Sequence, residues 1–103
     1  MSARSNANMA APLGRMQERT RQAREGMAEK LFSRAALESA MSDASAAGHS
    51  VARIEPEKPV DLYETAAAKA AAAWLAEQGF RVKWDRKARP ELGQEWRVLV
   101  IEW

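Results

Sequence analysis

The 103-residue sequence predicts a small α+β domain, and three observations support this prediction. Two segments carry apolar residues at helical spacing and end at a glycine, Gly48 in the first and Gly79 in the second. After Gly79, apolar and polar residues alternate over 80–85, which is typical of a strand with one face in water. Residues 96–103 are apolar on both sides, so we expect this strand to be covered on both faces and central in its sheet.

Together with an N-terminal helix, these segments give the order helix, helix, strand, helix, strand, strand. The last two strands should pair as a hairpin, and a short strand over 50–54 should take the other edge of the C-terminal strand. We therefore predict a three-stranded, mainly antiparallel sheet with packed helices. Residues 1–32 are expected to form a flexible start and a basic helical arm, and residues 33–103 a single small domain.

The arm is predicted from a heptad-like stripe of apolar and small residues. The stripe consists of Met9, Leu13, Met16, Thr20, Ala23, Met27 and Leu31. Residues 1–8 are small and polar, and we expect them to be extended or disordered. Because proline is best accommodated in a first turn, the helix should begin near Ala11 or Pro12. The stripe is thin and the helix contains two glycines, so it needs a partner surface for stability.

The two other helices have predicted caps. Ser33 should cap the second helix, and the proline-containing segment 55–60 is expected to be a linker. Asp61 followed by Glu64 matches an aspartate version of the capping box, which places the start of the third helix at Asp61. The face of this helix that packs on the sheet should consist of Tyr63, Ala67, Ala70, Ala71, Trp74 and Leu75.

The C-terminal part contains the expected core and one expected loop. Gly79 should end the third helix in a Schellman motif, in which Leu75 and Phe80 touch. Residues 86–94 are expected to form the loop of the hairpin, with proline and glycine as turn residues. The predicted core residues here are Trp74, Val100 and Trp103.

Composition argues against most catalytic chemistry. The chain has no cysteine, which excludes disulfides and Cys-type zinc sites, and the single His49 excludes clusters of histidines. No motif places a nucleophile near His49, and the carboxylates around the hairpin match no ligand loop. We therefore predict a non-enzymatic protein with no catalytic, cofactor-binding or metal-binding residues. Without a signal peptide or a long apolar run, it is expected to be cytoplasmic and not to bind membranes.

The arm is the first candidate for a binding surface. Residues 1–34 carry seven basic and three acidic residues, although the whole chain has a net charge of only +2. The predicted partner-binding residues are Arg15, Met16, Arg19, Met27 and Leu31. The arm can dock on another protein, pair with a second copy of the chain, or bind phosphates. The structural alternative is a helix that only covers its own sheet.

The basic hairpin is the second candidate, for nucleic acid. Its residues are Arg81, Lys83, Trp84, Arg86, Lys87 and Arg89. Basic side chains would hold phosphates, and an aromatic ring would stack on a base. The alanine-rich helix before the hairpin has no polar recognition face, so readout of the major groove is not expected.

From residue 37 to residue 103 the pattern resembles that of small bacteriophage proteins of mostly unassigned activity. The matching pieces are Gly48-His49-Ser50-Val51, Gly79-Phe80-Arg81-Val82 and Ile101-Glu102-Trp103. The expected long loop and the basic N-terminal helix depart from that pattern. The resemblance implies a phage context and no particular activity. The resulting hypothesis is an accessory protein that binds another protein, as a small virion component or an inhibitor of a host or defence protein. The alternative is a regulator that binds nucleic acid through the hairpin and the arm.

Overall fold

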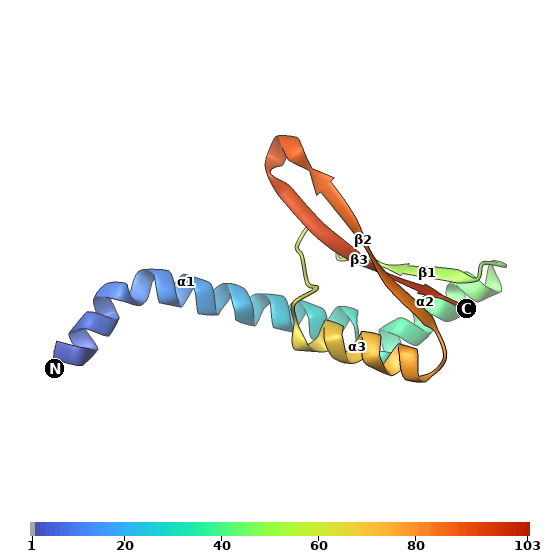
Figure 1. Cartoon of the computed structure of the whole chain (residues 1–103), viewed down its shortest axis with the longest axis horizontal. Helices are drawn as coiled ribbons and strands as arrows, with labels where there is room; N and C mark the ends of the chain where they lie inside the picture. The colour runs from blue at the N-terminus through green and yellow to red at the C-terminus, as the bar shows by residue number, and fades with distance from the viewer. Residues whose placement is uncertain (1) are drawn as a thin grey trace.

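The computed structural model of the chain describes the backbone of residues 2–103 and the side chains of residues 11–103. The elements are α1 (Ser2–Leu31), α2 (Arg34–Ala46), β1 (Val51–Ile54), α3 (Ala66–Glu77), β2 (Arg81–Arg89), a 3-10 turn (Pro90–Leu92) and β3 (Gln94–Glu102). This is the predicted order of helices and strands. The α+β fold is thereby confirmed (Figure 1).

The three strands form one antiparallel sheet in the order β1-β3-β2, so the C-terminal strand is central as predicted. Leu99 of β3 lies opposite Ile54 of β1 on one side and opposite Trp84 of β2 on the other. The pairing with β2 continues to Arg89, whereas β1 covers only the C-terminal half of β3. The far half of the hairpin therefore projects beyond β1, as Figure 1 shows.

The helices cover one face of this sheet. Leu99 and Ile101 of β3 are fully buried there, in a cluster with Leu37 of α2 and Leu75 of α3. Ala68 and Ala71 bring α3 close to the sheet because alanine adds little width to a helix. A Schellman motif ends α3, since the N–H of Phe80 donates to the carbonyl of Leu75 at 3.1 Å. The predicted glycine stops therefore set where the chain turns into strands.

The other face of the sheet is covered by charged side chains. Val98 and Val100 are buried although no helix lies over them. Arg53 of β1 and Asp85 of β2 form an ion pair of 2.9 Å, and these two strands are separated by β3. The pair therefore spans the central strand, and its aliphatic parts cover the valines. The sequence correctly predicts a strand covered on both faces, but not that ionic side chains provide one of the covers.

A second ion pair crosses the same face of the sheet, nearer the turn of the hairpin. Nζ of Lys87 lies 2.9 Å from the carboxylate of Glu55, over the buried ring of Trp96. The hydrogen bond from Lys87 lowers the pKa of Glu55 below its ordinary value of 4.5, with smaller contributions from the indole N–H of Trp96 and from Arg53. The indole nitrogen makes no regular hydrogen bond to a described residue, so its interaction with Glu55 is a weak one.

The first helix projects from the domain as an arm (Figure 1). Ala28 is buried, and Phe32, just beyond the end of α1, is buried with it, whereas residues 12–24 are all exposed. The helix begins at Ser2 and not near Ala11 as predicted. Pro12 lies inside it and removes one backbone hydrogen bond, at a cost of about 3 kcal/mol. The neighbouring alanines favour helix, and the helical path continues across the proline.

The third helix begins later than predicted. Its first residue is Ala66, and Thr65 is the N-cap, whose hydroxyl accepts a hydrogen bond from the N–H of Ala68 at 3.2 Å. Asp61 does not cap this helix: its Oδ1 atom accepts from the N–H of Tyr63 at 3.4 Å, in a local turn, and from the N–H of Arg97 on the central strand at 3.2 Å. Asp61 thus joins the segment before α3 to a strand residue 36 positions away.

Two further expectations are corrected. Residues 86–89 belong to β2 and not to a loop, and the turn is confined to the 3-10 segment and Gly93, which has a φ of 63°. A glycine suits this turn because side chains disfavour that conformation. Ala70 is exposed, and Ala68 takes the buried place expected of it. Trp103 is 39% exposed, with its ring edge against Phe80, and is not in the core.

Candidate functional site

The exposed stripe of α1 is the main candidate surface. Leu13, Met16 and Met27 are 67%, 49% and 44% exposed, and they lie on the same side of the helix. Thr20 and Ala23 lie between them and are also exposed. Leu31 is half-buried at the junction with the domain, and the side chain of Met9 lies outside the described residues. We call these described positions, from Leu13 to Leu31, the arm stripe.

Basic residues flank the arm stripe on both sides. At about 100° per residue, Arg19 and Lys30 lie along one flank and Arg24 along the other, whereas Arg15 lies farther round the helix, on the side of Glu29. Arg19, Arg24 and Lys30 are exposed, and none of them forms an ion pair with another side chain among residues 11–103. We call these three residues the basic flanks. Their charges are therefore available to a partner.

The acidic residues of α1 lie on the opposite side. They are Glu18, Glu25 and Glu29, which recur at spacings of seven and four. Glu18 accepts hydrogen bonds from Arg21, and these bonds lower the pKa of Glu18 and raise that of Arg21. The arginine nearest the acids is thus neutralised within the helix. The charged residues beside the stripe are therefore basic, and the acidic residues lie away from it, on the side that also carries Arg15.

Glu25 fixes the direction of the arm. Its carboxylate accepts a hydrogen bond of 3.0 Å from the N–H of Ala66, the first residue of α3. The negative charge also suits the N-terminus of a helix. Ala28, three residues later, is buried in the core. The C-terminal end of α1 is thus attached to the domain, and the exposed residues 12–24 extend away from it.

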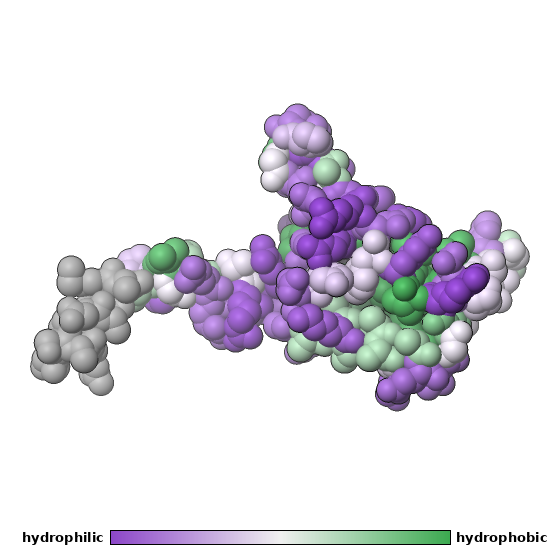
Figure 2. All heavy atoms as spheres, in the orientation of Figure 1, coloured by the Kyte–Doolittle hydropathy of each residue, from purple (hydrophilic) through white to green (hydrophobic). Residues whose placement is uncertain are grey.

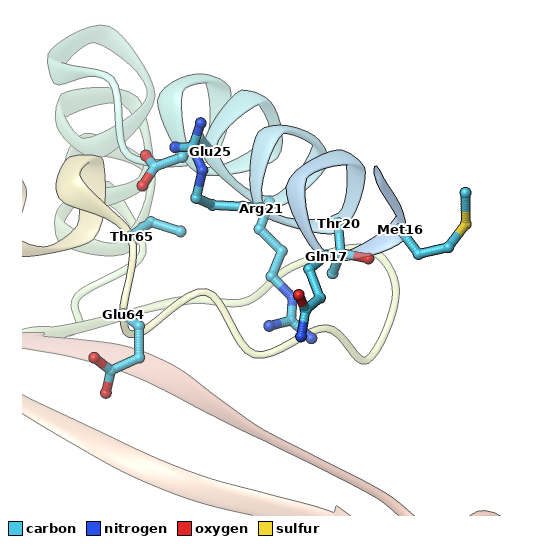
Figure 3. Close-up of a pocket in the computed structure, with 8 residues that line it drawn as sticks. Met16, Gln17, Thr20, Arg21, Glu25, Glu64 and Thr65 are labelled. Atoms are coloured by element: carbon cyan, nitrogen blue, oxygen red, sulfur yellow. The ribbon is translucent and has the colours of Figure 1, made fainter. Parts of the chain in front are cut away.

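A hollow of about 390 Å³ lies where the arm leaves the domain. It is lined by Met16, Gln17, Thr20, Arg21, Arg24, Glu25, Glu64 and Thr65. Figure 3 shows Met16 pointing away from Glu64 and Thr65. Met16 and Thr20 belong both to this hollow and to the arm stripe, and four of the other lining residues are charged.

A larger groove of about 570 Å³ lies at the base of the arm stripe. Its lining residues are Met27, Lys30, Leu31, Ala36, Pro56, Glu57, Lys58 and Leu62. Met27 and Leu31 belong both to this groove and to the stripe. The apolar surface therefore continues from the free arm into the groove between α1, α2 and the linker. Figure 2 shows the arm from one side, largely hydrophilic with a hydrophobic patch beside the grey atoms.

The hairpin residues proposed for nucleic acid are divided between the two faces of the sheet. Trp84 lies on the helix side, with its ring edge-on to Phe32 and to Tyr63 at centroid distances of 5.9 and 5.1 Å. Lys87 is paired with Glu55, and Arg86 with Glu95 at 3.3 Å. Trp84 thus packs against the core, and carboxylates neutralise the charges of Arg86 and Lys87.

The remaining three basic residues of the hairpin lie on the face of the sheet that the helices do not cover. Arg81, Lys83 and Arg89 are exposed and alternate along β2. Arg89 lies over the ring of Trp96, 6.0 Å from its centroid. No carboxylate among residues 11–103 forms an ion pair with these three residues. Arg81 and Lys83 lie near one end of β2 and Arg89 at the other, with the paired residues Asp85 and Lys87 between them. Trp96 is buried and is not available for stacking.

The carboxylates and His49 are the remaining candidates for chemistry. Among the residues that the structure describes, no group of three or more histidine, cysteine, aspartate or glutamate side chains could hold a metal ion. His49 is exposed in the turn after α2. No helix in this part of the chain is long and apolar enough to cross a membrane.

Sequence reasoning missed several contributors to the arm surface. Arg24 and Lys30 complete the basic flanks, and a helical projection of residues 13–31 was a sufficient signal for both. Ala36, Pro56 and Leu62 line the groove, but they come from three separate segments. No local pattern shows that such segments meet.

Comparison with known proteins identifies no relative. No protein-family model matches the chain. No curated protein and no solved structure matches it either. The surface chemistry of the arm is therefore the basis for the functional proposal.

Proposed function

We propose that this chain is a non-enzymatic accessory protein that binds another protein through α1. The carrying observation is the arm stripe, whose apolar residues are exposed on a helix that projects from its domain. An isolated helix of this composition is marginal in water, so a covered stripe stabilises both the helix and the complex. Met16 and Met27 are adaptable apolar contacts. Arg15 and Arg19 steer the encounter with an acidic surface.

The mechanism is occlusion or assembly by a rigid domain that presents a helix. The resemblance of residues 37–103 to small bacteriophage proteins favours two roles, a small virion component or an inhibitor of a host or defence protein. In both roles, the sheet and α3 orient the arm, and the arm makes the contact. The protein then acts in the host cytoplasm or in the virion.

Site-specific photo-crosslinking in the native host tests this function. A photoreactive amino acid is placed at Met16 or Met27 on the arm stripe and, as matched controls, at Gln22 or Glu29 on the opposite side of α1. All four positions are exposed. We expect a discrete protein adduct from the stripe positions only. Equal labelling from both sides, or none from the stripe, would contradict the proposal.

A nucleic-acid-binding regulator is the second candidate, supported by the exposed basic residues Arg81, Lys83 and Arg89 on one face of β2. Gel-shift measurements with DNA and RNA at low and physiological salt test it. Phosphate binding should weaken steeply with salt. No shift even at low salt would eliminate this candidate.

A further inference from the structure

We infer that the partner segment of the arm is an amphipathic helix whose apolar seam is flanked by acidic side chains. This inference rests on the proposed protein-binding function of α1. The partner helix would lie along the arm stripe and extend into the groove at Met27 and Leu31. Three observations point to this chemistry: the heptad spacing of the stripe, the sign of its flanks and the continuity of the groove.

The spacing of the stripe suits a helix. Leu13, Met16, Thr20, Ala23 and Met27 alternate at intervals of three and four. This is the pattern that allows side chains of one helix to fit between those of another. From Leu13 to Leu31 the surface is about 27 Å long at 1.5 Å per residue, which matches a partner helix of about five turns. The small Thr20 and Ala23 leave room for larger apolar residues of that partner.

The flanks determine the charge of the partner. In paired helices, residues beside the apolar seam face residues beside the seam of the partner. Here these positions on α1 are the basic flanks Arg19, Arg24 and Lys30. At the groove, Lys58 adds a further positive charge and Glu57 one negative charge. Acidic residues beside the partner's seam would thus meet an excess of positive charge from Arg19 to Lys30.

The same charges disfavour a second copy of this chain as the occupant. Two copies of α1 paired through their stripes would bring basic flanks against basic flanks in either orientation. The glutamates of α1 lie on the opposite side of the helix and cannot compensate. Like charges across such a seam select against pairing. Self-association through the stripe is therefore an outcome that the structure opposes.

The apolar centre separates a protein helix from the other anionic partners. Nucleic acid would use the arginines but would leave Leu13, Met16 and Met27 in water. A membrane-surface helix usually carries a broad apolar face with aromatic residues, whereas this stripe is narrow and has none. A helix with an apolar seam and acidic edges uses both the stripe and the flanks.

The test uses the full chain and three labelled 21-residue peptides, each of three heptads. The first has leucine along its seam and glutamate beside it, the second has lysine in place of glutamate, and the third has serine in place of leucine. Fluorescence anisotropy at nanomolar peptide measures affinity. We expect the leucine–glutamate peptide to bind at least tenfold more tightly than either control. Equal affinity for the glutamate and lysine peptides, or no binding, would overturn the inference.

A charge-reversed variant provides the matched control. In R19E/R24E/K30E the flanks become acidic, and the fold should persist because all three residues are exposed and unpaired among the described side chains. Circular dichroism checks the fold. This variant should prefer the lysine peptide. It should also form a heterodimer with the natural chain in sedimentation experiments, whereas each protein alone stays monomeric.

The same proteins and peptides, together with lipid vesicles, distinguish other partners of the arm stripe. Dimerisation of the natural chain that is abolished by Met16→Asp would overturn the inference in favour of a second copy. Binding to phosphatidylglycerol vesicles without binding to the leucine–glutamate peptide would overturn it in favour of an anionic membrane. If photo-crosslinks form at Met16 while the peptides fail, protein binding stands and only the acidic helix is rejected. If both experiments fail, the function is rejected as well.

Discussion

The carboxylate of Glu25 accepts a hydrogen bond of 3.0 Å from the backbone N–H of Ala66 and so joins the arm to the first residue of α3. The two residues are 41 positions apart in the chain. With the Thr65 hydroxyl, which accepts from Ala68, it satisfies two of the N–H groups at the start of this helix. A single charged side chain thus serves both the attachment of the arm and the cap of α3.

Replacing Glu25 by alanine should lower the free energy of unfolding by about 1 kcal/mol, since one capping hydrogen bond is lost. Urea denaturation followed by circular dichroism measures this change. Hydrogen exchange should also become faster in residues 25–31 and in the first turn of α3. Glu29→Ala is the matched control, because Glu29 is exposed and makes no ion pair with another described side chain. A similar loss in both variants would contradict the role of Glu25.

Truncation of the arm should have two distinct outcomes. Residues 12–20 are all exposed. Removal of residues 1–20 should therefore leave the melting temperature of the domain nearly unchanged. Removal of residues 1–30 also removes Glu25 and the buried Ala28, and it uncovers Phe32. We expect this longer deletion to cost more than about 2 kcal/mol. Equal stability of the two truncated proteins would show that the base of α1 is not part of the core.

Leu99→Asp should unfold the domain. Leu99 is fully buried on the central strand, between Ile54 and Trp84 of the two edge strands. An unpaired carboxylate there would cost at least about 4 kcal/mol, comparable to the whole stability of a small domain. Leu92→Asp is the control, because Leu92 is exposed in the hairpin turn. Circular dichroism and gel filtration distinguish the two, and a folded Leu99→Asp protein would contradict the burial of β3.

The ion pair between Glu55 and Lys87 should make the free energy of unfolding depend on pH. The pKa of Glu55 is lowered in the folded protein, so its contribution is present above the ordinary value of 4.5 and is lost as pH falls through the lowered pKa. Glu55→Gln should therefore be less stable than the natural protein at pH 7, and the difference should shrink below pH 4.5. Chemical denaturation over this range measures it. Glu57→Gln is the control, because Glu57 is exposed and makes no ion pair with another described side chain. A pH-independent difference for Glu55→Gln would refute the assignment.

Local rules determined much of the fold from the sequence alone. The glycine stops after the second and third helices, the cap at Ser33 and the alternation after Gly79 depend on residues within a few positions of one another. The apolar character of both sides of β3 also required a central strand, which the sheet confirms. Repeated apolar spacing likewise identified the arm stripe without any knowledge of its surroundings.

Tertiary structure decided where local signals had competitors. Asp61 does not cap α3, and its carboxylate instead accepts from the N–H of Tyr63 and from that of Arg97, which is distant in sequence. Residues 86–89 became strand because backbone pairing with β3 does not depend on the polarity of their side chains. Arg53 and Asp85 met over β3 because sheet order, and not sequence distance, places their strands on either side of it. Neighbouring residues therefore determined the helix stops and the arm stripe. The cap, the ionic cover and the groove depended on contacts between segments that only folding brings together.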